Sequence, residues 1–143
     1  MFPEHLRSGT AITPFPASKT AKMNVKRAKR VMARRKDINN TVAFLDIDAG
    51  KSHFNLMYGR CPCIIRSRGS RGFWIMNRQR RMTTHECARF QGINKHFDLE
   101  KLRISNTTFG HAVGNVMSLP VVGKILKNLA YAAGLIAGSG VPF

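Results

Sequence analysis

The stretch "RRMTTHECARFQGI", residues 80–93, predicts a short helix whose start can be read from the sequence. Thr83 and Glu86 have the spacing of a capping box. In that motif the threonine hydroxyl accepts a hydrogen bond from the amide of Glu86, and the carboxylate accepts one from the amide of Thr83. The helix continues through Phe90, and Gly92 suits its C-terminal turn. A helix this short is not stable alone, so we expect other parts of the chain to pack against it.

A second helix is predicted after "AVGNVMSLP", residues 112–120. Ser118 can cap this helix, and Pro120 is tolerated in its first turn. Apolar and polar residues separate onto two sides at helical spacing, with Val122, Ile125, Leu126, Leu129 and Ala133 on one and Lys124, Lys127, Asn128 and Tyr131 on the other. The pattern predicts an amphipathic helix that packs on something larger, and it suggests a missing partner surface.

Three short apolar stretches before residue 80 are predicted to be strands. "VAFLDID", residues 42–48, contains β-branched residues and is followed by a turn at "AGKSH". "CPCIIRS", residues 61–67, and "GFWIM", residues 72–76, are the other two. Trp74 in the last stretch either stacks on a nucleic-acid base or lies in the core.

The segment "RSRGSRG", residues 66–72, is predicted to be a loop between the last two strands. Its glycines allow a tight turn and a close approach to a ligand. Arg66, Arg68 and Arg71 carry guanidinium groups that suit phosphates or guanine edges. We therefore expect these arginines to contact DNA. The alternative is an ordinary exposed hairpin loop.

A basic helix is predicted from "KTAKMNVKRAKRVMARRK", residues 19–36, which holds nine basic residues. A thin apolar stripe recurs at helical spacing, formed by Ala21, Val25, Ala28 and Met32. Lys26 and Arg30 are candidate DNA contacts on the other side, and the alternative is a solvated face that binds nothing. Residues 1–18 contain three prolines and no periodicity, which predicts an irregular tail.

The charge of the whole chain is strongly positive. Lys and Arg number 24 against seven acids, a formal net charge of +17. No acid lies between Glu4 and Asp37, and none between Asp48 and Glu86, so two long segments are purely basic. Such a field attracts polyanions, of which nucleic acid is the usual one. An anionic membrane surface or a solvated basic tail are the alternatives.

The cysteines and the C-terminal segment argue against a zinc protein, a disulfide-stabilised protein and a membrane-spanning protein. Cys61, Cys63 and Cys87 lack the spacing of a zinc site or a disulfide framework, so we expect free thiols, no metal and a reducing compartment. The apolar run of residues 119–143 is interrupted by Lys124 and Lys127, which makes it a poor membrane span. A soluble intracellular protein, located where DNA is, is expected.

Two of these segments together resemble the C-terminal end of DNA cytosine-5 methyltransferases. "RRMTTHECARFQGI" resembles the ninth motif of that family, and "GNVMSLPVVGKIL", residues 114–126, resembles the tenth. They occur in the family's order and at its separation, after a basic Gly-rich segment. The resemblance covers residues 60–134 well and residues 19–59 loosely.

The resemblance implies a mechanism and several residue roles. Enzymes of this family flip cytosine out of the duplex, attack it with a cysteine, and take the methyl group from S-adenosylmethionine. By analogy, Asn115, Val116 and Met117 would line the cofactor pocket after the turn at Gly114. The ninth motif would be structural, with roles for Arg80, Arg81, Thr83 and Glu86.

The departures from the family concern its chemistry. The Phe-x-Gly-x-Gly cofactor loop, the Pro-Cys-Gln nucleophile loop and the Glu-Asn-Val segment are absent from the sequence. Cys63 follows Pro62 but precedes Ile64, at a place that belongs to the recognition domain. His111 replaces the usual Gln before the tenth motif. No catalytic residue is therefore expected in this chain.

The expected fold is α+β: short mixed strands of a recognition domain, followed by helices that return to a Rossmann-like α/β methyltransferase core. The predicted division is an irregular tail at residues 1–18, a basic helix and linker at 19–40, a partial recognition domain at 41–80, and the C-terminal motifs at 81–143. The chain would bind duplex DNA and complement a catalytic part, in the same protein or in a second subunit. The alternative is a stand-alone basic nucleic-acid-binding protein without catalysis.

Overall fold

The computed structural model describes residues 18–35, 41–93 and 103–137 of the 143-residue chain. The predicted irregular tail lies almost wholly outside the described residues. The elements in chain order are α1 (Lys19–Ala33), β1 (Ala43–Leu45), β2 (Leu56–Tyr58), α2 (Arg66–Arg71), β3 (Trp74–Ile75), β4 (Arg80–Arg81), α3 (Thr84–Phe90), α4 (Asn106–Asn115) and α5 (Leu119–Ala132). The predicted α+β class is confirmed.

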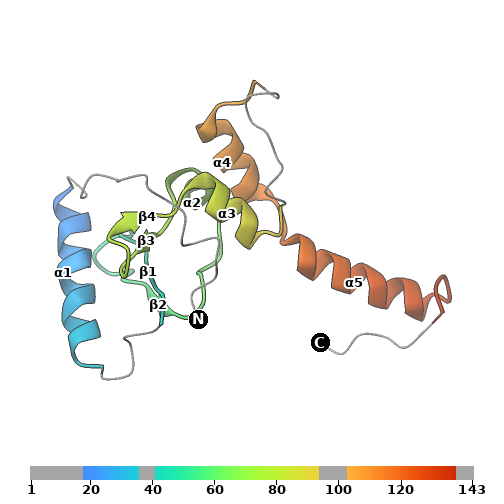
Figure 1. The fold of residues 1–143 in the computed structure, drawn as a ribbon, viewed down its shortest axis with the longest axis horizontal. Coiled ribbons are helices and arrows are strands. Elements are labelled where there is room, and N and C mark those ends of the chain that lie inside the picture. Colours follow the sequence, from blue (N-terminus) through green and yellow to red (C-terminus); the bar gives the residue numbers. More distant parts are fainter. Residues whose placement is uncertain (1–17, 36–40, 94–102, 138–143) are drawn as a thin grey trace.

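The four strands form one small sheet in the order β2-β1-β3-β4, and every pairing between them is antiparallel. Phe44 in the central strand β1 lies opposite Met57 on one side and Ile75 on the other. Successive side chains of a strand point to opposite faces. The central strands β1 and β3 therefore supply apolar residues to both faces of the sheet, each of which is covered by helix (Figure 1).

Helix α1 covers one face of the sheet. The predicted apolar stripe is confirmed, because Ala21, Val25 and Ala28 are buried and Met32 packs beside them. Their partners include Ala43 and Leu45 of β1, Trp74 of β3, and Ile47 and Met76, which follow these two strands. Trp74 is fully buried in this cluster, so its core alternative is the correct one.

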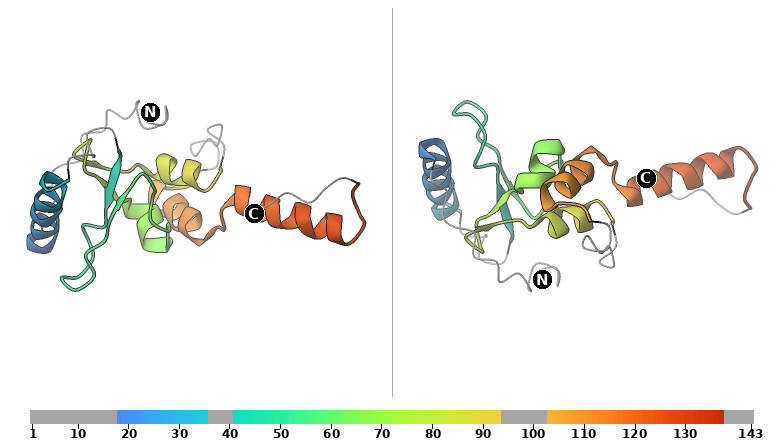
Figure 2. Two further views of the ribbon diagram at one scale, coloured as in Figure 1. Left: turned by 90° about the horizontal axis from the view of Figure 1, so that it is seen from below. Right: turned by 90° about the horizontal axis from the view of Figure 1, so that it is seen from above.

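Helices α2, α3 and α4 cover the other face (Figure 2). The core on this side contains Phe44 and Ile75 from the sheet, Cys87 and Ala88 from α3, Phe109 and Val113 from α4, and Val42, Ile64, Phe73 and Met82 from the connections. The helix predicted from the opening stretch is confirmed as α3, and the strands predicted around residues 42–48 and 72–76 are confirmed as β1 and β3.

Two of the predictions around residues 61–72 are wrong. Residues 61–65 do not form a strand, and "RSRGSRG" is the helix α2 rather than a loop. Glycine and serine disfavour a helix locally. Tertiary packing overrides this preference, because the missing side chain of Gly69 lets α4 lie directly on α2. Three further elements, β2, β4 and α4, were not predicted from the sequence.

Helix α5 begins at Leu119 with a proline in its first turn, as predicted. It extends away from the rest of the described chain (Figure 1), and none of its residues is buried. Leu126 and Leu129 of its apolar side are 58% and 60% exposed. Among the described residues nothing buries this apolar side, so its packing on a larger body stays a prediction. In the described part of the chain, no helix is both long and apolar enough to cross a membrane.

Candidate functional site

The start of α3 is the capping box that the sequence predicted. The hydroxyl oxygen of Thr83 accepts a hydrogen bond of 3.1 Å from the amide of Glu86, and Oε2 of Glu86 accepts one of 2.8 Å from the amide of Thr83. These bonds satisfy amides that the first turn of a helix leaves without partners. The first residue of α3 is thereby fixed relative to β4.

Glu86 has a second partner that the helix pattern did not reveal. The Arg80 guanidinium donates two hydrogen bonds to its carboxylate, of 2.8 and 2.7 Å, and both side chains are buried. Burial opposes the charged form of Glu86, but the bonds from Arg80 and Thr83 outweigh it, so the pKa of the carboxyl lies below its usual value. The hydrogen bond to Glu86 likewise raises the pKa of Arg80 against the effect of burial. Glu86 is thus buried and ionised, and its carboxylate is hydrogen-bonded to Arg80 and Thr83. It is therefore unsuited to donate a proton in acid catalysis.

Removing the cap while keeping this ion pair should have a modest cost. We expect Thr83→Ala to lower the free energy of unfolding by about 1 kcal/mol, because the amide of Glu86 then loses its acceptor. Thr83→Ser is the matched control, since serine retains the hydroxyl, and it should stay close to the native protein. Urea unfolding of both variants checks this. An unchanged stability in Thr83→Ala would show that water replaces the cap at no cost.

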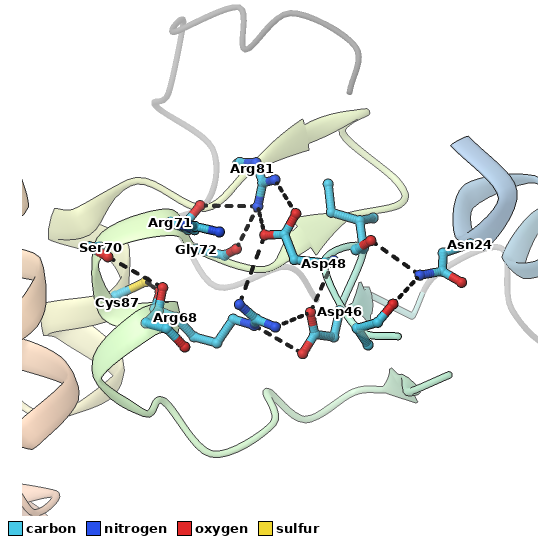
Figure 3. Close-up of polar contacts among 12 residues, drawn as sticks. Asn24, Asp46, Asp48, Arg68, Ser70, Arg71, Gly72, Arg81 and Cys87 are labelled. Carbon is cyan, nitrogen blue, oxygen red and sulfur yellow. Dashed lines mark hydrogen bonds and ion pairs between the residues drawn. The ribbon is translucent and has the colours of Figure 1, made fainter. Parts of the chain in front are cut away.

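A network of two arginines and two aspartates joins three segments on the α2 side of the sheet (Figure 3). Arg81 donates two bonds of 2.9 Å to the carboxylate of Asp48, and Arg68 binds Asp46 at 2.9 Å. Burial opposes the charged form of Asp48, but its bonds to Arg81 and the nearby Arg68 and Arg71 lower its pKa overall. The network ties β4 and α2 to the turn that follows β1.

This network bears on the predicted DNA contacts. Arg68 is directed at the aspartates, and its side chain is only 13% exposed. Arg66 and Arg71 are exposed at the two ends of α2. Arg66 and Arg71 are therefore more accessible to a ligand than Arg68. Lys26 and Arg30 are exposed on α1, on the other face of the sheet.

Three glycines allow α2 and α4 to cross with their backbones in contact. A Cβ atom on Gly69 would lie 2.7 Å from the amide nitrogen of Gly114 and closer still to the carbonyl oxygen of Gly110. A Cβ on Gly110 would lie 2.7 Å from the carbonyl oxygen of Gly69, and one on Gly114 would overlap the backbone of Ile65 and Arg66. Gly114, the first residue of the "GNVMSLP" segment, is therefore needed for helix packing.

Beside this crossing lies a hollow of about 470 Å³, open to solvent. Its lining is mostly apolar and comes from the segment before α2, the C-terminal ends of α3 and α4, and the segment that leads into α5: Cys61, Pro62, Cys63, Ile64, Ile65, Phe90, Gln91, Gly114, Val116, Met117, Ser118 and Val121. Val116 and Met117, two of the three predicted cofactor contacts, belong to the lining, whereas the third, Asn115, is exposed and does not.

Gln91 links the segments that line this hollow through hydrogen bonds. Its side-chain amide donates hydrogen bonds to the main-chain carbonyl oxygens of Val113 (3.5 Å) and Val116 (3.3 Å). Its main-chain carbonyl oxygen accepts a hydrogen bond of 2.9 Å from the amide of Leu119. The turn after α3 is thus bonded to the end of α4 and to the start of α5. No local pattern in the sequence predicts this role of Gln91, because its partners lie more than twenty residues away along the chain.

The three cysteines are free thiols. Burial raises the pKa of both Cys61 and Cys87 to about 12, so neither is a thiolate at neutral pH. Cys63 is exposed at the edge of the hollow. Among the described residues, no group of His, Cys, Asp or Glu side chains has the arrangement of a metal site.

Comparison with protein families gives one match. The model of the C-5 cytosine-specific DNA methylase family matches residues 6–130, which includes all of the hollow and both faces of the sheet. No curated protein and no solved structure matches the chain.

Proposed function

Because this chain belongs to the C-5 cytosine-specific DNA methylases, we propose that it forms the C-terminal part of a cytosine-5 methyltransferase. It would contact DNA, and it would contribute the residues that complete the pocket for S-adenosylmethionine. Residues 41–80 would belong to the recognition domain, and residues 81–143 would carry the returning motifs. The observation that best supports this is the hydrogen bonding of Gln91, which unites the two family-like segments around one hollow.

The lining of the hollow suits one part of the S-adenosylmethionine molecule, but not the whole molecule. Its apolar lining, including Val116, Met117 and Phe90, can pack against a flat ring such as adenine. Among the described residues, the lining contains no carboxylate for a ribose hydroxyl, and the sequence has no Phe-x-Gly-x-Gly loop. Bound S-adenosylmethionine would supply the methyl group, while these residues would orient the cofactor and exclude water from it.

A complementary catalytic part is required by this proposal. The sequence lacks the Pro-Cys-Gln nucleophile loop and the Glu-Asn-Val segment. The exposed apolar side of α5, with Ile125, Leu126 and Leu129, is the surface on which we expect the catalytic part to pack. Burial of these side chains would provide the association with a hydrophobic driving force.

The proposal is tested by complementation. The purified chain should transfer no label from S-adenosylmethionine to duplex DNA alone. It should do so when co-expressed with a catalytic fragment of the family that carries the cofactor and nucleophile loops. Label transferred by the chain alone, and lost in Cys63→Ala, would make Cys63 a nucleophile and overturn this assignment.

The cofactor role of the hollow is tested in the complemented enzyme. Met117 is 67% exposed in this chain, so Met117→Ala should not disturb folding. We expect it to raise the KM for S-adenosylmethionine by about ten-fold, the loss of one partly buried apolar contact. Val31→Ala, at an exposed apolar position on α1, is the matched control and should leave this KM unchanged. Equal KM values in both variants would place the cofactor elsewhere.

A second candidate function, a stand-alone nucleic-acid-binding protein, is favoured by the exposed basic side of α1. The two candidates differ in the role of α5. If the chain binds DNA fully but never associates with a catalytic fragment, this second function is the correct one.

A further inference from the structure

The exposed side of α1 carries positive charge, and within the part of the chain that the structure describes no acid forms an ion pair with it. The exposed basic residues of α1 are Lys19, Lys22, Lys26, Arg27, Lys29 and Arg30, and Arg34 and Arg35 follow directly after its end. The described residues contain three acids, Asp46, Asp48 and Glu86, and all three pair with Arg68, Arg80 or Arg81 instead. The basic side of α1 is therefore available to an external polyanion.

Some of these basic residues line a groove beside α1. The groove has a volume of about 450 Å³ and is lined by α1 and by the turn after β1, through Met23, Asn24, Lys26, Arg27, Arg30 and Lys51. We call it the α1 groove. Four of its six lining residues are cations, which come from two separate segments of the chain.

The packing of α1 on the sheet holds the walls of the α1 groove in place. The buried Asn24 amide donates hydrogen bonds of 3.1 and 3.0 Å to the carbonyl oxygens of Ile47 and Ala49, in the turn that leads to Lys51. The guanidinium of Arg27 lies 4.3 Å above the centre of the Phe54 ring, a cation–π contact. Little ordering is therefore needed when a ligand enters, which favours binding.

The α1 groove and the hollow lie on opposite faces of the sheet. Helix α1 is on one side of the strands, and α2, α3 and α4 are on the other, in each of the three views (Figures 1 and 2). The sheet therefore separates α1 from the helices that line the hollow.

We propose that the α1 groove is a second DNA-docking site, which binds the phosphate backbone of duplex DNA outside the target base pair and does not read sequence. Lysine ammonium groups bind phosphates as point charges, which position a protein on DNA without specifying bases. The identification of DNA as the polyanion rests on the proposed function. The groove itself rests on its charge and geometry.

The test measures binding of the full chain to short duplexes over a range of salt concentrations, without cofactor. Replacing Lys26, Arg30 and Lys51 with alanine should remove three phosphate contacts and lower the slope of log affinity against log salt by about 2.7. Binding near 0.1 M salt should weaken on the order of a hundred-fold. Two duplexes of unrelated sequence should show the same loss. Lys124→Ala with Lys127→Ala, on α5, is the control and should keep the native slope.

Other outcomes would overturn the proposal. A native salt slope in the triple variant would mean that the α1 groove does not contact phosphates. A loss confined to one duplex would mean that it reads bases. Loss of binding to phosphatidylserine vesicles with DNA binding retained would make it a lipid-headgroup site.

Lys26→Arg with Lys51→Arg, which keeps the charge, should retain binding, and circular dichroism verifies the fold of each variant. Because no methyl transfer is measured, failure here is distinct from failure of complementation.

Discussion

Replacing Gly69 with alanine should lower the free energy of unfolding by about 3 kcal/mol or more. The added Cβ would meet the backbone of Gly110 and Gly114, and the distance to the amide nitrogen of Gly114 would be 2.7 Å. Backbone atoms in a packed helix cannot rotate away as a side chain can, so α2 and α4 would have to separate. Small domains are stable by only about 5–15 kcal/mol, so this is a large part of the total. Urea unfolding followed by the fluorescence of Trp74, which is fully buried, measures it.

Gly123→Ala is the matched control for this substitution. Gly123 lies inside α5, and a Cβ at this position would meet nothing within 4 Å. Alanine favours a helix over glycine by about 1 kcal/mol, so this variant should gain helicity in circular dichroism and keep the native unfolding transition of Trp74. If Gly69→Ala unfolds at the same urea concentration as the control, the close crossing of α2 and α4 is wrong.

The second large effect is expected for Glu86→Gln. Glutamine can replace glutamate in a capping box, so the sequence alone would predict little change. The structure reverses that expectation, because the buried guanidinium of Arg80 would lose the carboxylate that neutralises it. Breaking a buried ion pair in this way costs about 3–5 kcal/mol. Urea unfolding of the variant measures the loss.

Two further variants separate the ion pair from other effects. Asp48→Asn removes the partner of Arg81, but the side chains of that pair are 22% and 20% exposed, against 7% and 5% for Arg80 and Glu86, so its loss should cost less than the loss of the Arg80–Glu86 pair. Arg80→Met combined with Glu86→Gln leaves no unpaired buried charge and should recover part of the stability lost in Glu86→Gln. A double variant that is no more stable than Glu86→Gln would contradict the assigned pairing.

The ion pair also predicts how stability depends on pH. The pKa of Glu86 is lowered in the folded protein from an ordinary value of 4.5. The unfolded chain therefore takes up a proton first as the pH falls. The contribution of Glu86 to stability is fully present above 4.5 and is lost as the pH drops through the lower folded pKa. The lowered pKa of Asp48 acts with the same sign. The stability difference between the native protein and Glu86→Gln should accordingly be largest near neutral pH and shrink in acid.

Glu86→Gln also bears on the role of this residue in the complemented enzyme. If Glu86 is structural, any loss of turnover should follow the loss of stability and be reduced by lowering the temperature. A large loss of turnover in a variant with native stability would make Glu86 a chemical residue.

Local patterns in the sequence determined several elements of this protein. The capping box set the first residue of α3, the helical spacing of Ala21, Val25 and Ala28 identified the packed side of α1, and proline after Ser118 marked the start of α5. Each of these features depends on residues within a few positions of one another. The composition likewise showed that the chain carries a large positive charge.

The tertiary structure alone decided the features that make the candidate site. The helical state of α2 depends on contact with α4, about forty residues later, and glycine's absent side chain gives no local signal of that contact. Arg68 was expected to face DNA and instead binds Asp46, while Gln91 joins segments that are distant in sequence. Neither partnership follows from spacing, because which charges and carbonyls meet is set by how the helices pack on the sheet. The sequence therefore determined where helices begin and which sides are apolar, and the packing determined which residues surround the hollow and which cations remain free to bind.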